Sequence, residues 1–317
     1  MFIFLFGCIN HKSISVPYIS REEPALGTFI SITTEKTPNC EIILDNAFSL
    51  IKDIEKKFSR FISDSEISRL NRNKKIDASE DLIYVIKKSI EISRITGGAF
   101  DITVLPLIKL YKESEKKGIP PSAEEIKHIL KYIGYKKIKI KDKYILIPEG
   151  TELDTGGIAK GYIVDKVALF LKQQGLKNGL INAGGDIYCF GKNPDGEKWK
   201  IGIRDPFNKE KTLKILYLSN CGIATSGDYE RYLSIKGKKY GHIINPLTGK
   251  TVQNFPVSVT VIAKDTTTAD GFATAFFVLG VEKSIRLANN LEGVDTFIID
   301  GNGRYYESKN FSKFTLP

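Results

Sequence analysis

Hydrophobic residues recur along the chain with two different spacings. Between residues 41 and 58 they fall three or four positions apart, as on one face of an amphipathic helix, whereas residues 27–33 alternate apolar with polar side chains, as a half-buried strand does. The first pattern predicts further helices at residues 66–70, 81–95, 123–132, 158–174, 268–279 and 282–290. The second predicts strands at residues 136–140, 144–147, 179–182, 186–190, 199–203, 212–218, 231–236, 257–263 and 295–299. Helices and strands mix without regular alternation, so we expect an α+β (mixed α/β) fold.

The order of these segments indicates one folded body behind a short N-terminal tether. The chain shows no internal repeat and no linker long enough to divide it. Residues 11–22 are polar and irregular, so we expect residues 1–22 to be a leader and tether and residues 23–317 to form a single domain. With 317 residues, of which 42% are hydrophobic, the chain can bury a large core, which excludes fibrous and wholly disordered classes.

The formal net charge of +10 would suit an anionic partner, but the basic residues are scattered. The densest run, residues 136–141, alternates lysine with isoleucine and is typical of a strand with one solvated face. Aromatic residues are numerous enough to stack on a heterocycle, yet none lies in an RNA-recognition or zinc-finger pattern. We therefore expect no nucleic-acid partner.

The four cysteines, Cys8, Cys40, Cys189 and Cys221, include no C-x-x-C pair and have no histidine at zinc-finger spacing. A disulfide framework and a structural zinc site are therefore not expected. Cys8 closes an apolar opening whose last four residues, Leu-Phe-Gly-Cys, resemble a bacterial lipobox, although this opening is too short to span a bilayer and lacks a basic leader. Two interpretations remain open: a lipid anchor on Cys8, with the true start further upstream, or a chance apolar terminus. No later segment approaches the roughly 20 apolar residues of a membrane span.

Residues 154–161 (Asp-Thr-Gly-Gly-Ile-Ala-Lys-Gly) follow a predicted strand and open a predicted helix. Glycines at a helix N-terminus let backbone amides approach a phosphate, and Lys160 adds a positive charge suited to a phosphoryl oxygen. The alternative is an ordinary glycine-rich turn, because the segment matches neither common nucleotide-binding loop. Residues 182–186 and 225–231 are further small, polar turns, each weak evidence alone.

Two other places carry candidate chemistry. His242 lies where a predicted strand enters an Asn-Pro turn, and it is either a functional or a satisfied structural histidine. Asp270 and Thr274 are four residues apart, so on a helix their oxygens share one face. Carboxylate and hydroxyl oxygens are hard ligands suited to Mg²⁺, although Asp270 could instead cap the helix while Thr274 packs.

Taken together and in this order, these segments resemble the ApbE family of FAD:protein FMN transferases. The motifs that carry the resemblance lie at residues 26–28, 58–71, 96–103, 154–161, 182–186, 225–231, 242–249 and 269–274. The resemblance implies a flavin nucleotide in a cleft, with Mg²⁺ bridging the protein to its pyrophosphate. It assigns the metal to the side chains of Asp270 and Thr274 and the carbonyl of Gly157. It assigns the flavin site to Leu26, Phe61, Ala99, Phe100, Asp101, Asp154, Lys160, His242 and Ile244.

The chain departs from the family pattern at two of these positions. Leu26 stands where many members have methionine, and Phe61 where many have tyrosine, so stacking can persist while a phenolic hydrogen bond is lost. Some relatives changed near the second position hydrolyse FAD, so this substitution leaves the balance between transfer and hydrolysis open.

The resemblance implies transfer of the FMN half of FAD to a threonine hydroxyl of an acceptor protein, with release of AMP. Mg²⁺ and Lys160 would neutralise pyrophosphate charge, and either His242 or an aspartate near the metal, such as Asp270, would accept the hydroxyl proton. The alternatives are an Mg²⁺-dependent FAD pyrophosphatase and a non-catalytic flavin-binding lipoprotein. We expect the enzyme to be lipid-anchored at the outer face of the bacterial inner membrane, beside an acceptor subunit of a membrane redox complex.

Overall fold

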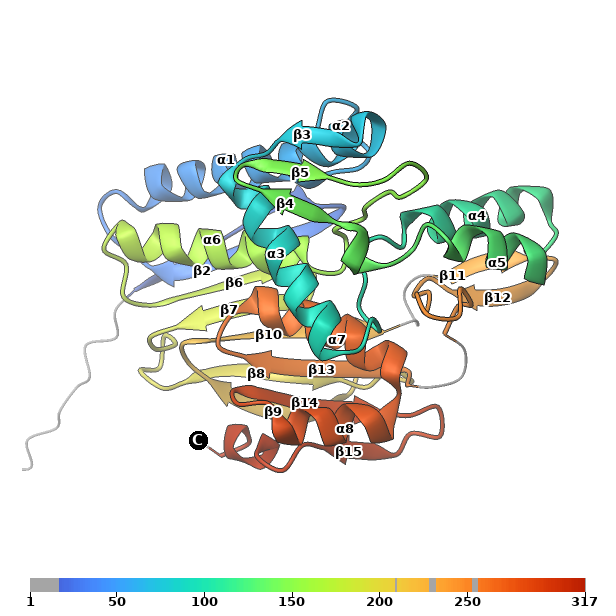
Figure 1. Ribbon diagram of the computed structural model, residues 1–317. Coiled ribbons are helices and arrows are strands. Elements are labelled where there is room, and N and C mark those ends of the chain that lie inside the picture. The colour runs from blue at the N-terminus through green and yellow to red at the C-terminus, as the bar shows by residue number, and fades with distance from the viewer. Residues whose placement is uncertain (1–16, 209, 228–231, 253–255, 317) are drawn as a thin grey trace, which may run out of the picture.

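The computed structural model describes residues 17–208, 210–227, 232–252 and 256–316, and it is built on one large antiparallel sheet (Figure 1). Every neighbouring pair of strands in this sheet is antiparallel. Its strands, in spatial order, are β1 (Tyr18–Ala25), β2 (Thr28–Glu35), β6 (Gly179–Ala183), β7 (Asp186–Phe190), β10 (Cys221–Gly227), β13 (Ser258–Ala263), β14 (Val294–Ile299) and β15 (Tyr305–Glu307). The α+β class predicted from the sequence is confirmed.

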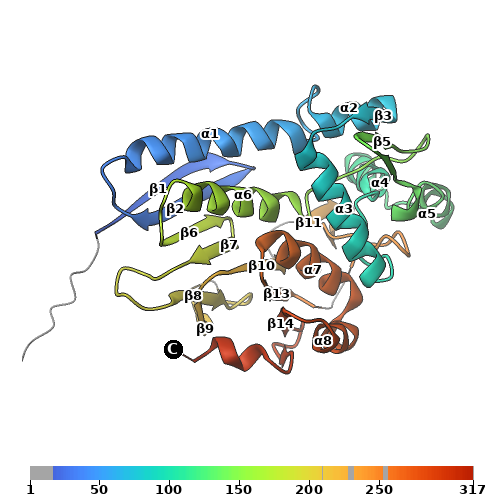
Figure 2. The same ribbon diagram turned by 60° about the vertical axis from the view of Figure 1, so that its left-hand side comes forward.

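A layer of helices covers one face of the sheet (Figures 1 and 2). Its members are α1 (Cys40–Phe58), α3 (Glu80–Ile95), α6 (Ala159–Gln173), α7 (Thr266–Leu279) and α8 (Val281–Asn290). Helix α6 packs against β6 and β7, and α7 packs against β10 and β13. The apolar stripe of α1, which includes Ile43, Ala47 and Ile51, faces the same core as the inward side chains of β2. This core holds α6 and α7 side by side over the middle of the sheet.

The opposite face of the central strands is covered by a hairpin of β8 (Trp199–Arg204) and β9 (Thr212–Leu218). Strand β8 alternates buried and exposed positions, and Trp199, Ile201 and Ile203 point inward. Because both of their faces are covered, β13 and β14 are buried at every position and show no alternation.

The remaining elements form the upper rim of the molecule, away from the central sheet (Figure 1). One group packs beside α1, and the other extends toward the end that carries α5. These elements are α2 (Glu66–Asn73), β3 (Lys75–Asp77), α4 (Leu105–Lys117), α5 (Ala123–Leu130), η1 (Tyr135–Lys137), β4 (Lys139–Lys141), β5 (Tyr144–Leu146), β11 (Tyr232–Ile235) and β12 (Lys238–Gly241), and a last turn, η2 (Phe311–Phe314), follows β15.

Most predicted elements are confirmed within a few residues, but three predictions are wrong. Residues 18–22, expected in the tether, form the first part of β1, which pairs with β2 along its whole length. The strand predicted at residues 136–140 begins only at Lys139, because residues 135–137 form a 3₁₀ turn in which the backbone N–H of Tyr135 donates to the buried Asp101 carboxylate. Of the turn expected at residues 225–231, residues 225–227 are the end of the central strand β10, and residues 228–231 lie outside the described residues. Helix α4 was not predicted, although Pro106 in its first turn is compatible with a helix start.

Two further expectations concern the membrane. Cys8 and the rest of the apolar opening lie outside the described residues, so the lipid anchor stays a prediction. Within the described ranges, none of the helices combines the length and the apolar composition needed to cross a bilayer.

The close approach of β10 to the start of α7 gives a first prediction. A Cβ at Gly222 would lie 2.3 Å from the backbone nitrogen of Thr266, so Gly222→Ala requires a backbone shift of α7. We expect a loss of about 1–3 kcal/mol in the free energy of unfolding, measured by urea denaturation. Gly202→Ala in β8 is the matched control, because its Cβ meets no atom closer than the Thr212 methyl carbon at 3.1 Å. Equal losses in both variants would contradict the prediction.

Candidate functional site

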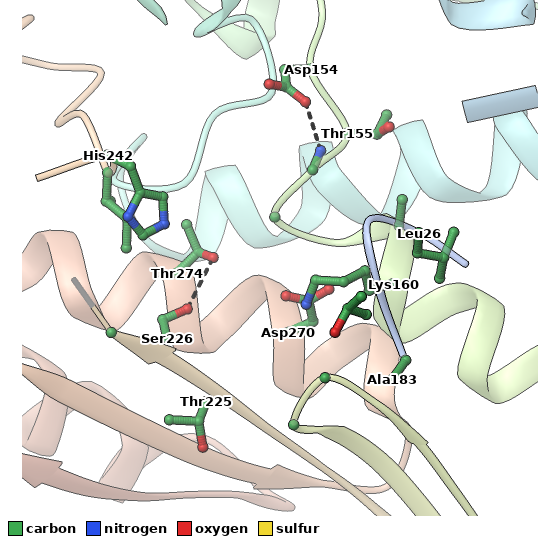
Figure 3. Close-up of a pocket in the computed structure, with 18 of the residues that line it drawn as sticks. Leu26, Asp154, Thr155, Lys160, Ala183, Thr225, Ser226, His242, Asp270 and Thr274 are labelled. Carbon is green, nitrogen blue, oxygen red and sulfur yellow. Dashed lines mark hydrogen bonds between the residues drawn. The ribbon is translucent and has the colours of Figure 1, made fainter. Parts of the chain in front are cut away.

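A deep cleft of about 1040 Å³ opens where the helical layer, the turns of the large sheet and the rim elements meet. All twelve residues that the sequence analysis assigned to a flavin or metal site line this one cleft, although they come from segments spread between residues 26 and 274. Figure 3 shows several of them pointing toward a common space. Their roles remain predictions, but their convergence is a property of the fold.

Leu26 occupies the tip of the two-residue turn between β1 and β2. Ala25 pairs with Thr28, so Leu26 and Gly27 make the turn, with φ of +56° and +69°. Hairpin turns of this kind need positive φ at both positions, which is costly for a leucine. The Leu26 backbone N–H donates to Glu55 Oε1 at 3.2 Å, which ties the turn to α1. The turn thereby presents a leucine side chain at the cleft wall.

Phe61 stands at the cleft mouth with 78% of its surface exposed. The Arg60 guanidinium carbon lies 4.8 Å from the ring centroid and the Lys112 ammonium nitrogen 5.7 Å from it. Both distances are within the range of cation–π attraction. An exposed aromatic ring at the mouth of a cleft is suited to stacking against a flat heterocycle.

Asp154 organises the glycine-rich loop that borders the cleft. Its Oδ1 accepts a hydrogen bond from the Gly156 backbone N–H at 2.8 Å, and its Oδ2 lies 3.2 Å from Arg60 Nε (Figure 3 shows the first of these). The Asp154 backbone N–H also donates to the Ile102 carbonyl. These contacts fix the course of the chain just before Gly157.

Ala99, Phe100 and Asp101 form a buried turn behind this loop. The Asp101 carboxylate accepts hydrogen bonds from the backbone N–H and hydroxyl of Thr103 and from the backbone N–H of Tyr135. Burial raises the pKa of Asp101, and these hydrogen bonds oppose the shift. The carboxylate therefore ties this part of the cleft wall to the 3₁₀ turn that begins at Tyr135.

Lys160, in the first turn of α6, forms an ion pair with Asp186, the first residue of β7. The Asp186 side chain is only 2% exposed, and burial raises its pKa, whereas the adjacent ammonium group lowers it. Lys160 is therefore anchored by a buried carboxylate. Its ammonium group still borders the cleft and stands near Asp270 (Figure 3).

Helix α7 places Asp270 and Thr274 on one face, as predicted. A Cβ at Gly157 would lie 3.1 Å from Thr274 Oγ1, so the Gly157 backbone borders this hydroxyl directly. Thr274 Oγ1 also lies 3.3 Å from Ser226 Oγ, at the end of β10. Asp270 Oδ2 accepts a hydrogen bond from the Gly161 backbone N–H at 3.1 Å. One carboxylate, one hydroxyl and one peptide backbone therefore meet at the seam between α6 and α7.

The structure decides whether Asp270 caps α7 and how far its side chain is buried. Asp265 and not Asp270 caps α7, since the Asp265 side chain accepts from the Thr268 backbone N–H at 2.7 Å. Asp270 is only 4% exposed, so it is not a solvent-facing residue. Burial raises its pKa to about 7, and the nearby Asp186 carboxylate adds to the shift.

These oxygens fit a hard divalent cation better than a soft one. Within the described residues, no three His, Cys, Asp or Glu side chains gather as a metal cluster. Mg²⁺ is commonly bound by one or two carboxylates and completes its shell with water and phosphate oxygens. A single buried carboxylate with a hydroxyl and the Gly157 backbone beside it is consistent with that donor set.

His242 and Ile244 line the cleft from the segment after β12. His242 is exposed, whereas Ile244 is buried and forms an isolated bridge with Thr251. The side-chain oxygen of Asn245 accepts from the Leu247 backbone N–H, and the backbone carbonyl of Asn245 accepts from the Gly249 backbone N–H. These two hydrogen bonds close the Asn-Pro turn. This turn holds His242 at the side of the cleft opposite Lys160 (Figure 3).

Three residues that support the site were not singled out from the sequence. They are Arg60, Asp186 and Ser226, which contact Asp154, Lys160 and Thr274 respectively. Each lies inside a motif that the sequence analysis quoted, but nothing in its local spacing shows which distant residue it contacts. The packing of α6 against β7 brings Lys160 to Asp186, and the packing of α7 against β10 brings Thr274 to Ser226.

A large cleft that combines an anchored lysine, a glycine loop at a helix start and a set of hard oxygen donors defines an enzyme acting on a phosphorylated ligand. Comparison with known proteins names the family. The sequence model of the ApbE family matches residues 26–298, and the chain belongs to this family. The enzyme class predicted from the sequence is confirmed.

Relatives and solved structures agree with this membership. The FAD:protein FMN transferase of Haemophilus influenzae is 35% identical over 306 residues, which cover 90% of this chain and 85% of that protein. The ApbE protein from Thermotoga maritima superimposes with a TM-score of 0.87 at 32% identity, over 95% of this chain and 100% of that one. The flavin transferase ApbE from Vibrio cholerae gives a TM-score of 0.83 at 30% identity, over 94% and 99% of the two chains.

The two contacts of Asp154 lead to a prediction that separates them. Asp154→Asn keeps an acceptor for the Gly156 N–H but loses the ion pair with Arg60, whereas Asp154→Ala loses both. We expect the free energy of unfolding, measured by urea denaturation, to fall by about 1–3 kcal/mol in the alanine variant and by less than about 1 kcal/mol in the asparagine variant. Equal losses in the two variants would show that the turn hydrogen bond contributes nothing.

Proposed function

We propose that this protein is an Mg²⁺-dependent FAD:protein FMN transferase, which moves the FMN half of FAD to a threonine hydroxyl of an acceptor protein and releases AMP. The observation that carries the proposal is the meeting of Gly157, Asp270 and Thr274 next to Lys160 in one cleft. The names of the curated relatives support the flavin-transfer reaction. The metal, the threonine acceptor and AMP release are parts of the proposal.

The dimensions of the cleft are compatible with a dinucleotide. Ligand clefts commonly measure roughly 300–1,000 Å³, and this one lies at the upper limit of that range. Phe61 and Leu26 supply apolar surface for the isoalloxazine ring, while Lys160 and the glycine loop lie where the pyrophosphate would be placed.

The residues of this chain have distinct tasks in the proposed reaction. Asp270, Thr274 and the Gly157 carbonyl would hold Mg²⁺, which when bound neutralises charge on the pyrophosphate. Lys160, kept in place by Asp186, stabilises negative charge that develops on the phosphoryl oxygens. The threonine oxygen of the acceptor forms a bond to the phosphorus of the FMN half, and the bond from that phosphorus to the bridging oxygen breaks, so AMP leaves with that oxygen.

A base must accept the proton of the attacking threonine. His242 is exposed in the cleft wall and can reach a group that enters from solvent. Asp270 is buried and would be occupied by the metal, which makes it less suited to this task. We therefore assign the proton transfer to His242.

FAD pyrophosphatase activity is a second candidate, with water in place of the threonine hydroxyl. Phe61 favours it, because an exposed phenylalanine at the cleft mouth cannot donate the hydrogen bond of the tyrosine found in many family members. A non-catalytic flavin-binding role is disfavoured, since Asp270 and Thr274 are both present and adjoin Gly157.

We also propose that the enzyme is attached by a lipid on Cys8 to the outer face of the bacterial inner membrane. The lipobox-like residues 5–8 support this proposal, and a membrane anchor would place the cleft near acceptor subunits of a membrane redox complex. Labelling with a radioactive fatty acid, lost in Cys8→Ala, is the expected result. Equal labelling of both proteins would exclude Cys8 as the attachment point.

Incubation with FAD, Mg²⁺ and a threonine-bearing acceptor domain tests the reaction directly. We expect a covalent FMN-sized mass increase on an acceptor threonine, AMP in equal amount, and no adduct when Mg²⁺ is chelated. Free FMN and AMP without any acceptor adduct would favour the pyrophosphatase. FAD that stays intact in every mixture would exclude both reactions.

Substitutions in the metal set test the assignment of its ligands. Asp270→Asn preserves the shape of a buried side chain, and Thr274→Val replaces a hydroxyl with a methyl group, so both remove ligands with little change in packing. We expect each to lower the rate of AMP release at least about 100-fold, as a lost electrostatic contact at a reacting phosphate does. Thr274→Ser keeps the hydroxyl and should retain most of the rate. Wild-type turnover in Asp270→Asn would contradict the assignment.

A further inference from the structure

Helices α6 and α7 face each other through a regular series of contacts. A Cβ at Gly157 would lie 3.1 Å from Thr274, and a Cβ at Gly161 would lie 2.9 Å from Asp270 Cβ. Asp165 Oδ1 accepts from the Thr266 backbone N–H at 2.8 Å. The pairs 157/274, 161/270 and 165/266 each advance four residues in opposite directions. Residues 157–165 and residues 266–274 therefore run antiparallel, and successive helical turns of the two segments lie opposite each other.

The middle pair leaves no space between the two backbones. A Cβ at Gly161 would lie 2.4 Å from the Thr266 carbonyl oxygen, which is closer than real Cβ contacts occur. The Gly161 N–H also donates to Asp270 Oδ2. Gly161 thus sets the distance between the helices and directs the Asp270 carboxylate at the same time.

The third pair is the most heavily bonded. Asp165 Oδ1 accepts from the Thr266 N–H, and Asp165 Oδ2 accepts from the Thr267 N–H at 2.8 Å and from the Thr267 hydroxyl at 2.5 Å. One carboxylate on α6 therefore receives three donors from the first turn of α7. Neither Asp165 nor Gly161 lines the cleft.

We propose that Asp165 and Gly161 are positioning residues for the metal set: they fix the register of α7 against α6, and with it the placement of Asp270 and Thr274 relative to Gly157. This inference rests on the proposed function, in which these three residues hold Mg²⁺. A slip of α7 by a fraction of a turn would separate Thr274 from Gly157, because the three pairs lie on one seam.

A merely local capping role for Asp165 does not account for the arrangement. Helix α7 has its own N-cap in Asp265, which binds the Thr268 N–H. Asp165 belongs to a different helix, four residues beyond Gly161 and eight beyond Gly157. Its hydrogen bonds therefore connect the two elements that carry the metal donors, in addition to satisfying the helix end.

Asp165→Asn tests this role, with Asp265→Ala as the matched control. Asparagine keeps the shape but replaces one acceptor oxygen with a donor, so the three donors of Thr266 and Thr267 cannot all be satisfied. Asp265→Ala removes a cap from the same turn of α7 without touching the contact with α6. Rates of AMP release from FAD are measured against Mg²⁺ concentration, together with melting temperatures by circular dichroism.

We expect Asp165→Asn to raise the half-saturating Mg²⁺ concentration at least tenfold while the rate at saturating Mg²⁺ falls much less. Asp265→Ala should lower the melting temperature but keep the half-saturating concentration within about twofold of wild type. A second measurement uses ADP, a diphosphate probe that lacks the flavin half. Mg²⁺ with ADP should raise the melting temperature, and in Asp165→Asn this rise should require a higher Mg²⁺ concentration by the same factor. Gly161→Ala should behave like Asp165→Asn if it folds.

The outcomes separate this inference from the proposed function. An unchanged Mg²⁺ dependence in folded Asp165→Asn, or an equal shift in Asp265→Ala, overturns the positioning role. Cleavage of FAD by the wild-type protein at a rate that does not depend on Mg²⁺ overturns the proposed metal chemistry. In that case the melting temperature in the presence of ADP is also independent of the Mg²⁺ concentration in every variant. A shift confined to Asp165→Asn and Gly161→Ala supports both.

Discussion

The structure depends on carboxylates held inside the protein where α6, α7 and β7 meet. Asp186 and Asp270 are almost completely buried, and Asp165 is partly buried beside them. Removing a charge from water is costly unless hydrogen-bond donors or cations compensate it. Each of the three carboxylates is compensated differently. Asp186 pairs with Lys160, Asp270 accepts from the Gly161 amide, and Asp165 accepts from Thr266 and Thr267. The hydrogen bonds of Asp270 and Asp165 join α6 to α7, and the pair of Asp186 joins β7 to α6.

The buried carboxylates depend on the close packing of glycine backbones against α7. Burial raises the pKa of Asp165 to about 6 and that of Asp270 to about 7, because the interior solvates these charges poorly. A cation beside Asp270 would stabilise its charged form, so the buried carboxylate and a divalent metal suit each other. The glycines at 157, 161 and 222 permit this, because a side chain at any of them would push α7 away from the loop, from α6 or from β10.

Much of the fold could be predicted because local patterns reflect burial on one side. Helix α1 and strand β2 each have one buried and one solvated face, so their periodicity was plain in the sequence. Strand β10 was missed because it is covered on both sides and built from small residues, which resemble a turn. Residues 135–137 were misread because the distant carboxylate of Asp101 binds their backbone, an interaction that no local pattern records.

The sequence by itself determined the family and the candidate residues of the site: the ordered motifs resembled one family, and the four-residue spacing of Asp270 and Thr274 placed their oxygens on one helical face. Only the tertiary structure decided what surrounds them. Helix α7 contacts α3, α6, α8, β10 and β13, so Asp270 is buried although its spacing is that of an ordinary amphipathic position. Spacing fixes direction about a helix axis, but the exposure of a side chain and the partner of its charge depend on which distant segments pack against that face.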